Sequence, residues 1–207
     1  MRRTFPFWVC LLMLMMLPGV SSAAEKIQPY ISAQVGGTYL TDAQISDYYG
    51  GASLDFVPGF SAGLAGGVKY GMFRVEGEFG YQINEIDSIN SYDTEEDGLY
   101  TGEGKGDMSA YTFLVNGYAD FDTGTPVTPF VTAGMGMAIV QLNDFFGGDY
   151  NDKVFAYQVG AGITYAINPK MNVDLKYRYL ATADPGLGGM DAEFASHNVY
   201  LGFRYNF

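Results

Sequence analysis

The feature that most constrains this sequence is an alternation of apolar and polar or small residues with a period of two. It is clear in the last segment, HNVYLGFRYNF, where every second residue is apolar or aromatic: Val199, Leu201, Phe203, Tyr205 and Phe207. This period is that of a β-strand with two different faces. Such a strand needs neighbours that pair with its backbone and an apolar environment for one face.

The same pattern recurs along the chain. The clearest copy is FSAGLAGGVKYGMFRVEGEFGYQI, in which two alternating runs are joined by a tight Gly71-Met72 turn and so predict a hairpin. In total, the alternation predicts eight strands: Gln28–Leu40, Phe60–Tyr70, Phe73–Ile83, Ser109–Phe121, Pro129–Val140, Val154–Ile167, Asn172–Leu180 and Asn198–Phe207.

The predicted connections alternate in length. Three are short, around Gly71, Gly124 and Pro169, and four are long, at 41–57, 84–108, 141–153 and 181–197. An even number of strands, with short turns at one end and long loops at the other, is typical of outer-membrane barrels. The sequence therefore predicts an all-β fold: an eight-stranded antiparallel up-and-down transmembrane β-barrel with short periplasmic turns and four long extracellular loops.

The aromatic residues decide which face of the strands points outward. A soluble barrel of the lipocalin kind would have the same alternation with the two faces exchanged, but an eight-stranded lumen has no room for so many rings. We therefore expect this set to face lipid: Tyr39, Phe60, Tyr70, Phe73, Phe79, Tyr81, Tyr111, Phe113, Phe121, Phe155, Tyr157, Tyr165, Tyr177, Tyr179, Phe203, Tyr205 and Phe207.

Charged residues occur on the opposite, small-residue face of the strands. They are Lys69, Arg74, Glu76, Glu78, Asp120, Asp174, Lys176, Arg178 and Arg204. Buried charges persist when they are paired and hydrogen-bonded, so we expect an interior salt-bridge network that plugs the lumen. A polar lining wetted by a few waters and an ion-conducting channel are the alternatives.

The N-terminal residues predict export. Arg2 and Arg3 precede an apolar run that ends at Leu17 and is followed by small residues, which is the layout of a secretory signal peptide. We expect residues 1–24 to be the signal peptide, with cleavage after Ala23 or Ala24, and residues 25–207 to be one barrel domain. The only cysteine, Cys10, lies within the apolar run, so the mature chain is expected to lack disulfides.

The charge of the chain restricts its partners. The net charge is −12, which makes nucleic acid an unsuitable partner. Most of the acidic residues fall in the predicted long loops, which would repel anions and attract divalent or basic partners, although simple solvation also explains them.

Motifs for catalysis or metal binding fail on inspection. Asp93, Glu95 and Asp97 match the opening spacing of a calcium loop, but the closing Glu103 comes one position early and no helices flank it. Ser196 and His197 are adjacent in sequence and would point to opposite faces of a strand. We expect no catalytic, metal-binding or cofactor-binding residues, and no enzyme activity.

Four segments in order resemble a known family. FRVEGEFGY, PFVTAGMGMA, FAYQVGAGITYAINPKMNVDLKYRYL and HNVYLGFRYNF are similar to the small outer-membrane beta-barrel family of Gram-negative bacteria, which includes opacity-type porin-like proteins, surface antigens and the barrel domain of OmpA-like proteins. The resemblance implies a C-terminal signal for the barrel-assembly machinery at Tyr200, Gly202, Tyr205 and Phe207.

The resemblance also implies a location and a set of roles. The location is the cell outer membrane, in contact with its lipid and lipopolysaccharide. The roles are envelope integrity and surface interaction, either adhesion or antigen-like, with host or cell-surface ligands reached through the acidic loops. A narrow porin-like channel for small solutes is the alternative, and a lipid-modifying barrel enzyme is a third hypothesis.

Overall fold

The computed structural model describes residues 26–41, 43–47, 50–93, 98–103, 106–145, 148–183, 186–187, 190–191 and 194–207. Side chains are described in 26–41, 57–85, 106–141, 151–183 and 194–207. The expected signal peptide, residues 1–24, lies outside the described residues and stays a prediction. Within these ranges no helix is long and apolar enough to cross a membrane.

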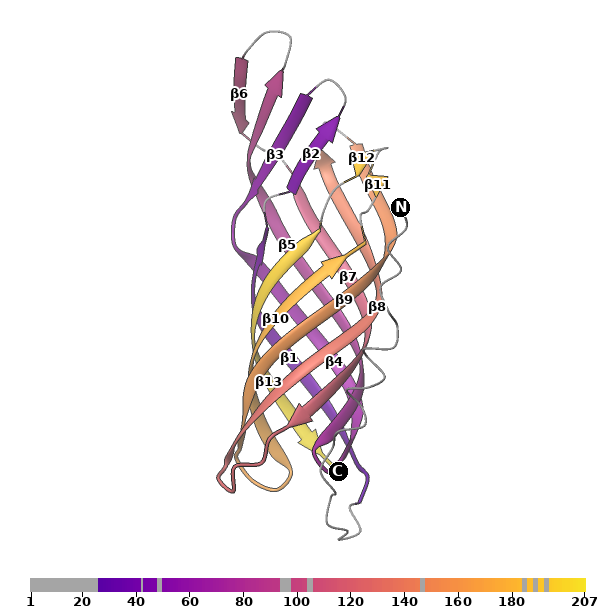
Figure 1. Ribbon diagram of the computed structural model, residues 1–207, viewed down its shortest axis with the longest axis vertical. Coiled ribbons are helices and arrows are strands. Elements are labelled where there is room, and N and C mark those ends of the chain that lie inside the picture. The colour runs from indigo at the N-terminus through magenta and orange to yellow at the C-terminus, as the bar shows by residue number, and fades with distance from the viewer. Residues whose placement is uncertain are drawn as a thin grey trace, which may run out of the picture.

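Eight long strands form a closed antiparallel barrel, which confirms the predicted fold (Figure 1). They are β1 (Gln28–Leu40), β4 (Gly59–Tyr70), β5 (Phe73–Asp93), β7 (Asp107–Asp120), β8 (Val127–Phe145), β9 (Gly148–Ala166), β10 (Met171–Thr182) and β13 (Ala195–Asn206). Each strand pairs with its neighbours in sequence, and β1 pairs with β13 to close the barrel. The Phe207 amide donates to the Pro29 carbonyl over 3.0 Å beside this seam.

The register of the strands fixes the tilt of the barrel. Tyr39 on β1 pairs with His197 on β13, which in turn pairs with Tyr179 on β10. Continuing from partner to partner around the barrel returns to β1 at Pro29, ten residues before Tyr39 in the sequence. With a rise of about 3.3 Å per residue and about 4.8 Å between strands, this stagger implies a tilt of about 40° and a backbone radius of about 8 Å. Side chains can fill a lumen of this width.

The two ends of the barrel differ, as predicted. At one end, called here the turn end, the connections are short: Gly71-Met72, with Gly71 at a φ of 57°, and residues 121–126 and 167–170. At the other, the loop end, shorter strands rise above the barrel: β2 (Ala43–Asp47), β3 (Gly50–Phe56), β6 (Gly98–Glu103), β11 (Gly186–Leu187) and β12 (Met190–Asp191) (Figure 1).

Several barrel strands are longer than their alternation predicts. The pattern ends at Ile83 and Val140, whereas β5 continues to Asp93 and β8 to Phe145. The reason is that the antiparallel ladder continues beyond the apolar stretch, with β3 and β6 pairing the top of β5 and β9 pairing the top of β8. Polar strands paired in this way no longer show the two-sided pattern of a membrane-spanning strand.

Candidate functional site

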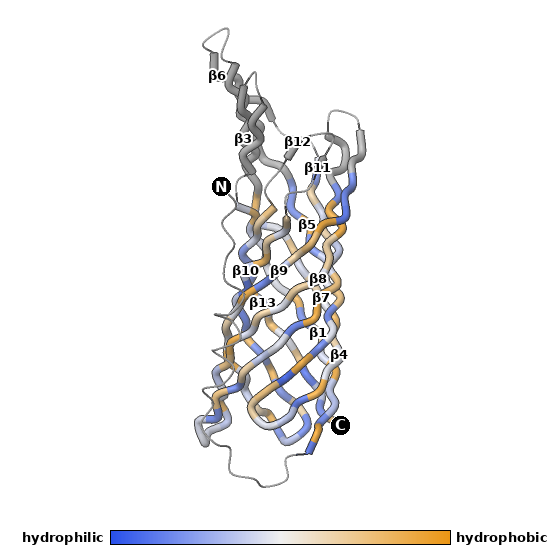
Figure 2. Tube along the Cα trace, turned by 45° about the vertical axis from the view of Figure 1, so that its right-hand side comes forward, coloured by the Kyte–Doolittle hydropathy of each residue, from blue (hydrophilic) through white to orange (hydrophobic). Residues whose placement is uncertain are grey.

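The outer surface of the barrel carries the aromatic residues. Phe113, Phe155 and Phe207, for example, have exposed fractions of 54%, 52% and 66%. Every ring of the predicted outward set is exposed or half-exposed, and the hydropathy alternates along the barrel strands (Figure 2). The outward set also has its own ring contacts, such as Phe79 with Phe113 at 5.0 Å between centroids. The chain thus has an apolar exterior.

Charged side chains fill the lumen near the turn end. Asp120 on β7 accepts from Lys69 on β4 at 3.0 Å and pairs with Arg74 on β5 at 2.8 Å. Arg74 also lies over the Tyr118 ring, 4.2 Å from its centroid. Arg74 and Asp120 are buried, whereas the Lys69 side chain is one-third exposed at 33%. One carboxylate thus holds two cations at the mouth of the barrel.

A second ion pair lies beside this group. Arg204 on β13 approaches Asp174 on β10 at 3.4 Å, and the Thr164 hydroxyl donates to Asp174 over 2.6 Å. The Arg204 guanidinium lies 5.5 Å from the centre of the Tyr30 ring. Among the described residues, nothing accepts a hydrogen bond from the Nε or Nη1 atom of Arg204.

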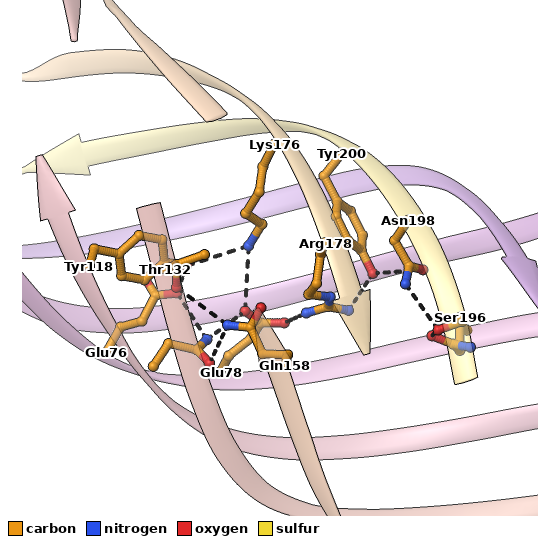
Figure 3. Close-up of polar contacts among 12 residues, drawn as sticks. Glu76, Glu78, Tyr118, Thr132, Gln158, Lys176, Arg178, Ser196, Asn198 and Tyr200 are labelled. Atoms are coloured by element: carbon orange, nitrogen blue, oxygen red, sulfur yellow. Dashed lines mark hydrogen bonds and ion pairs between the residues drawn. The ribbon is translucent and has the colours of Figure 1, made fainter. Parts of the chain in front are cut away.

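The centre of the lumen holds a cluster around Glu78 (Figure 3). Arg178 on β10 donates to Glu78 on β5 and to the Tyr200 hydroxyl on β13. Lys176 lies 3.7 Å from the same carboxylate. Asn116 donates to it over 2.9 Å. Glu78 is therefore the carboxylate that compensates two buried cations.

Glu76 has a different environment from Glu78. It accepts from Tyr30 over 2.9 Å, from Tyr118 over 2.5 Å and from Asn116 over 3.3 Å, all neutral donors. Among the described residues, no Lys or Arg forms an ion pair with it. Of the four predicted inward carboxylates, three are in ion pairs and Glu76 is held by hydrogen bonds alone.

The sequence analysis did not predict that the rings of Tyr30, Tyr118 and Phe130, on three of the barrel strands, lie inside the lumen. Glycines provide the space for them. A Cβ added at Gly67 would lie 2.8 Å from the Tyr30 ring, and one at Gly162 would lie 2.6 Å from the Phe130 ring. The alternation along β7 could have predicted this position, because Tyr118 is on the same face of the strand as the inward Asp120 and on the opposite face from the outward Val115.

An apolar layer fills the lumen at the loop end, and the sequence reasoning did not predict it either. Its members come from most of the strands and from the residue before β13: Leu40, Met108, Ala110, Leu114, Ala138, Val140, Val154, Ala156, Leu180 and Phe194. Phe194 is 1% exposed, and its carbonyl accepts from the Thr182 amide over 3.0 Å. We call this group the apolar seal.

A small cavity lies inside the barrel among the charged side chains. A cavity of about 20 Å³ lies among Arg74, Glu76, Asp174 and Lys176. This volume is about enough for a single water molecule and too small for a solute. The charged groups and the apolar seal therefore occupy successive levels of the lumen.

The structure does not assemble a nucleophile with a base at Ser196 and His197. Ser196 is fully buried in the lumen and donates toward Gln82 over 3.4 Å. His197 is on the outer face, where its Nδ1 lies 2.7 Å from the Tyr177 hydroxyl. In the described part of the chain, no group of His, Cys, Asp or Glu side chains is placed to hold a metal ion.

Most of the loop acids fall where side chains are not described. Of the positions that partly match a calcium loop, Glu95 and Asp97 lie outside the described residues, and the side chains of Asp93 and Glu103 are not described. The acidic character of the loops is therefore known from the sequence, and the positions of most of these side chains are not described.

Comparison with known proteins gives a consistent result. The family described as "Outer membrane protein beta-barrel domain" matches residues 7–207. The outer membrane protein PagN of Salmonella typhimurium is 28% identical over an alignment of 126 residues, and the match covers 50% of this chain and 52% of PagN. The match thus spans about half the length of that relative.

Two solved structures share the fold. Neisserial surface protein A has a TM-score of 0.60 and 20% identity over 88% of this chain and 100% of its own. The outer membrane protein OprG of Pseudomonas aeruginosa has a TM-score of 0.51 and 14% identity over 88% of this chain and 97% of its own. Because the family match covers residues 7–207, the chain belongs to the outer membrane protein beta-barrel domain family.

Proposed function

We propose that the protein is a surface-interaction protein whose barrel is a closed scaffold and whose loop-end strands make the contacts. The observation that carries this proposal is the filled lumen, with its buried ion pairs, its apolar seal and a cavity of only about 20 Å³. If no solute passes through the barrel, partners in solution can contact the protein only at its two ends. The extended strands make the loop end the larger of the two (Figure 1).

The proposal includes a structural role in the envelope. The outward aromatic face would hold the barrel among outer-membrane lipid and lipopolysaccharide. The separation of Ser196 from His197 supports a role without catalysis. The name of Neisserial surface protein A describes a surface protein on the same fold, although its identity of 20% supports the fold alone.

Insertion by the barrel-assembly machinery is part of the same proposal. Of the C-terminal residues implied as its signal, Tyr200 lies inside the lumen and Phe207 has an exposed fraction of 66%. Tyr205 is half-buried and contacts Phe207, with 5.3 Å between ring centroids. The aromatic end of β13 thus offers an outward surface for recognition before the barrel closes.

The experiment compares cells that produce the native protein with cells that produce a variant shortened within residues 84–108. Adhesion to immobilised host-type and bacterial surfaces is measured at equal surface amounts of protein. The shortened variant should lose adhesion while its barrel remains resistant to protease. A second variant, shortened at the 121–126 turn, is the matched control, because it changes the opposite end. Equal adhesion by all three strains, or by cells without the protein, would refute the proposal.

A further inference from the structure

The outer wall of the barrel has a depression that spans β4, β5 and β7. Its volume is about 610 Å³, which is within the range of sites that bind small molecules. Two glycines form its floor, because Gly66 on β4 pairs directly with Gly77 on β5. At either of them, an added Cβ would meet nothing within 4 Å. The backbone of two paired strands is therefore bare at this place, and we call the depression the wall groove.

The outward side chains that line the wall groove are all hydrocarbon. They are Ile31, Leu64, Phe79, Phe113 and Val115. Glu78 also borders the groove, but its carboxylate points into the lumen, where it pairs with Arg178. Among the described residues, no polar side chain on the outer face lines it. A ligand with polar groups would find no hydrogen-bond partner in this groove and would lose those it had in water.

The wall groove is closed toward the loop end and open toward the turn end. Phe79 and Phe113 are on its loop-end side, with 5.0 Å between their ring centroids. Toward the turn end, the next outward residues on β4 and β5 are Val68 and Val75, and neither of them lines the groove. A ligand longer than the groove would therefore extend toward the turn end.

The height of the groove on the wall restricts the ligand further. The outward apolar residues of β5 run from Phe73 to Ile83, and Gly77 comes four positions after Phe73. With a rise of about 3.3 Å per residue and a tilt of about 40°, Gly77 is about 10 Å above the turn-end rim of an apolar band about 25 Å tall. At that depth in a membrane, the surroundings consist of hydrocarbon chains.

A hydrocarbon chain fits this groove better than a second barrel does. A stable protein interface takes about 800 Å² from each partner, whereas the groove is only two strands wide at its floor. The convex wall of another barrel would contact the rim and leave the floor empty. A single extended acyl chain is about as wide as the spacing of the two paired strands, about 4.8 Å, and can lie on the bare backbone.

We propose that the wall groove binds one acyl chain of a phospholipid from the periplasmic leaflet. The short turns of such barrels are periplasmic, so a chain that enters from the turn end comes from that leaflet. Van der Waals contacts with Phe79, Phe113 and the glycine floor provide the attraction. This inference rests on the proposed placement of the barrel among outer-membrane lipid, and it adds a lipid class and a position.

Tryptophan fluorescence tests the inference, because the only tryptophan of the sequence, Trp8, is in the expected signal peptide. The Phe113→Trp variant, purified from outer membranes, is reconstituted in phospholipid vesicles, in which a fraction of the phospholipid carries bromine, a quencher, on one acyl chain. Brominated chains should associate with this reporter about threefold more strongly than with the wall elsewhere. The preference is modest because only packing contacts differ between groove and bulk lipid.

Three further variants locate the binding site. Tyr157→Trp, on the outer face of β9 and outside the groove, is the reporter of bulk lipid. In the Phe113→Trp protein, Gly77→Leu fills the groove without a clash and should abolish the preference. Gly37→Leu adds the same side chain at an outward glycine of β1 outside the groove, where a Cβ would have one contact, at 3.9 Å. It is the matched control and should keep the preference.

Three results would overturn the inference and leave the placement among lipid intact. One is equal quenching of the two reporters, which would show that the groove has no preference. Another is displacement of the brominated chain by lipopolysaccharide more readily than by unbrominated phospholipid, which would assign the groove to the other leaflet. The third is loss of quenching at Phe113→Trp as the protein-to-lipid ratio rises, which would show that a second copy covers the groove. Absence of quenching at both reporters would refute the inference and the placement together.

Discussion

Arg178 and Glu78 form an ion pair across the full width of the barrel, with both side chains at most 2% exposed. Their strands, β10 and β5, are four positions apart in either direction around the eight strands. The pair therefore ties opposite walls together at mid-height. Lys176, on the same strand as Arg178, shares the carboxylate.

Removing the Glu78 carboxylate should destabilise the folded barrel. Glu78→Gln leaves Lys176 and Arg178 buried without a countercharge, so we expect the free energy of unfolding to fall by about 3 to 5 kcal/mol. Glu76→Gln is the matched control, because its partners are neutral, and should cost about 1 kcal/mol. Urea unfolding of the refolded protein in micelles measures both. Equal losses in the two variants would contradict this assignment.

The lumen should not conduct ions. Reconstituted native protein is expected to show no steady single-channel current in planar bilayers, because the ion pairs and the apolar seal are two barriers in series. Phe194→Ala or Arg178→Ala alone should remain closed, since one barrier persists in each. The double variant is expected to conduct. A steady current through the native protein would instead support the alternative of a narrow porin-like channel.

Inward and outward glycines should respond in opposite ways to substitution. A Cβ at Gly136 would collide with the backbone of Phe113, so Gly136→Ala should cost about 1 to 3 kcal/mol. A Cβ at Gly66 on the outer face would meet nothing within 4 Å, and Gly66→Ala should be neutral or stabilise by about 0.5 to 1 kcal/mol. The midpoints of urea unfolding distinguish the two. Destabilisation at both sites would show that the outer face is also closely packed.

A charge on the lipid-facing surface should destabilise the barrel according to its depth. Val115 lies near the middle of β7 and is 61% exposed, so Val115→Arg should cost about 2 to 4 kcal/mol in a bilayer. Ile167→Arg, in a turn-end connection, should cost about 0 to 1 kcal/mol. Unfolding in lipid vesicles measures the difference. Little cost at Val115 would place that surface in water.

Export should leave a defined N-terminus. We expect the protein recovered from outer membranes to begin at Ala24 or Glu25, because the apolar run and the small residues that follow it specify a signal peptide. N-terminal sequencing or intact-mass measurement distinguishes the two products. Ala24→Leu should leave a single site or slow the processing. A mature chain that still contains Cys10 would refute the assignment.

The sequence predicts whether a strand residue faces outward or inward better than it predicts which side chains are in contact. A period of two assigns each strand residue to one face, which is why Phe79 could be placed outside and Glu78 inside. Which cation meets Glu78 depends on the stagger around all eight strands. The alternation carries no information about that stagger, so the pairing of Glu78 with Arg178 could not be deduced.

Two further features were not predictable, for related reasons. Phe130 shares the inward face of its strand, but its position depends on the space that Gly162 provides directly opposite it on β9. The apolar seal consists of isolated residues such as Leu40 and Phe194, which are distant in sequence and meet only when the strands close. The polar strands above the barrel, such as β6, lack the alternation of apolar and polar residues by which the barrel strands were predicted.

The closing seam between β1 and β13 has a consequence for biogenesis. The earliest and latest parts of the domain to be synthesised are neighbours, from Tyr30 beside Asn206 to Leu40 beside Ser196. No earlier fragment can finish the cylinder, since β1 would keep a free edge that invites aggregation. The unpaired apolar strands therefore need protection from aggregation until the last strand of the domain is available to pair with the first.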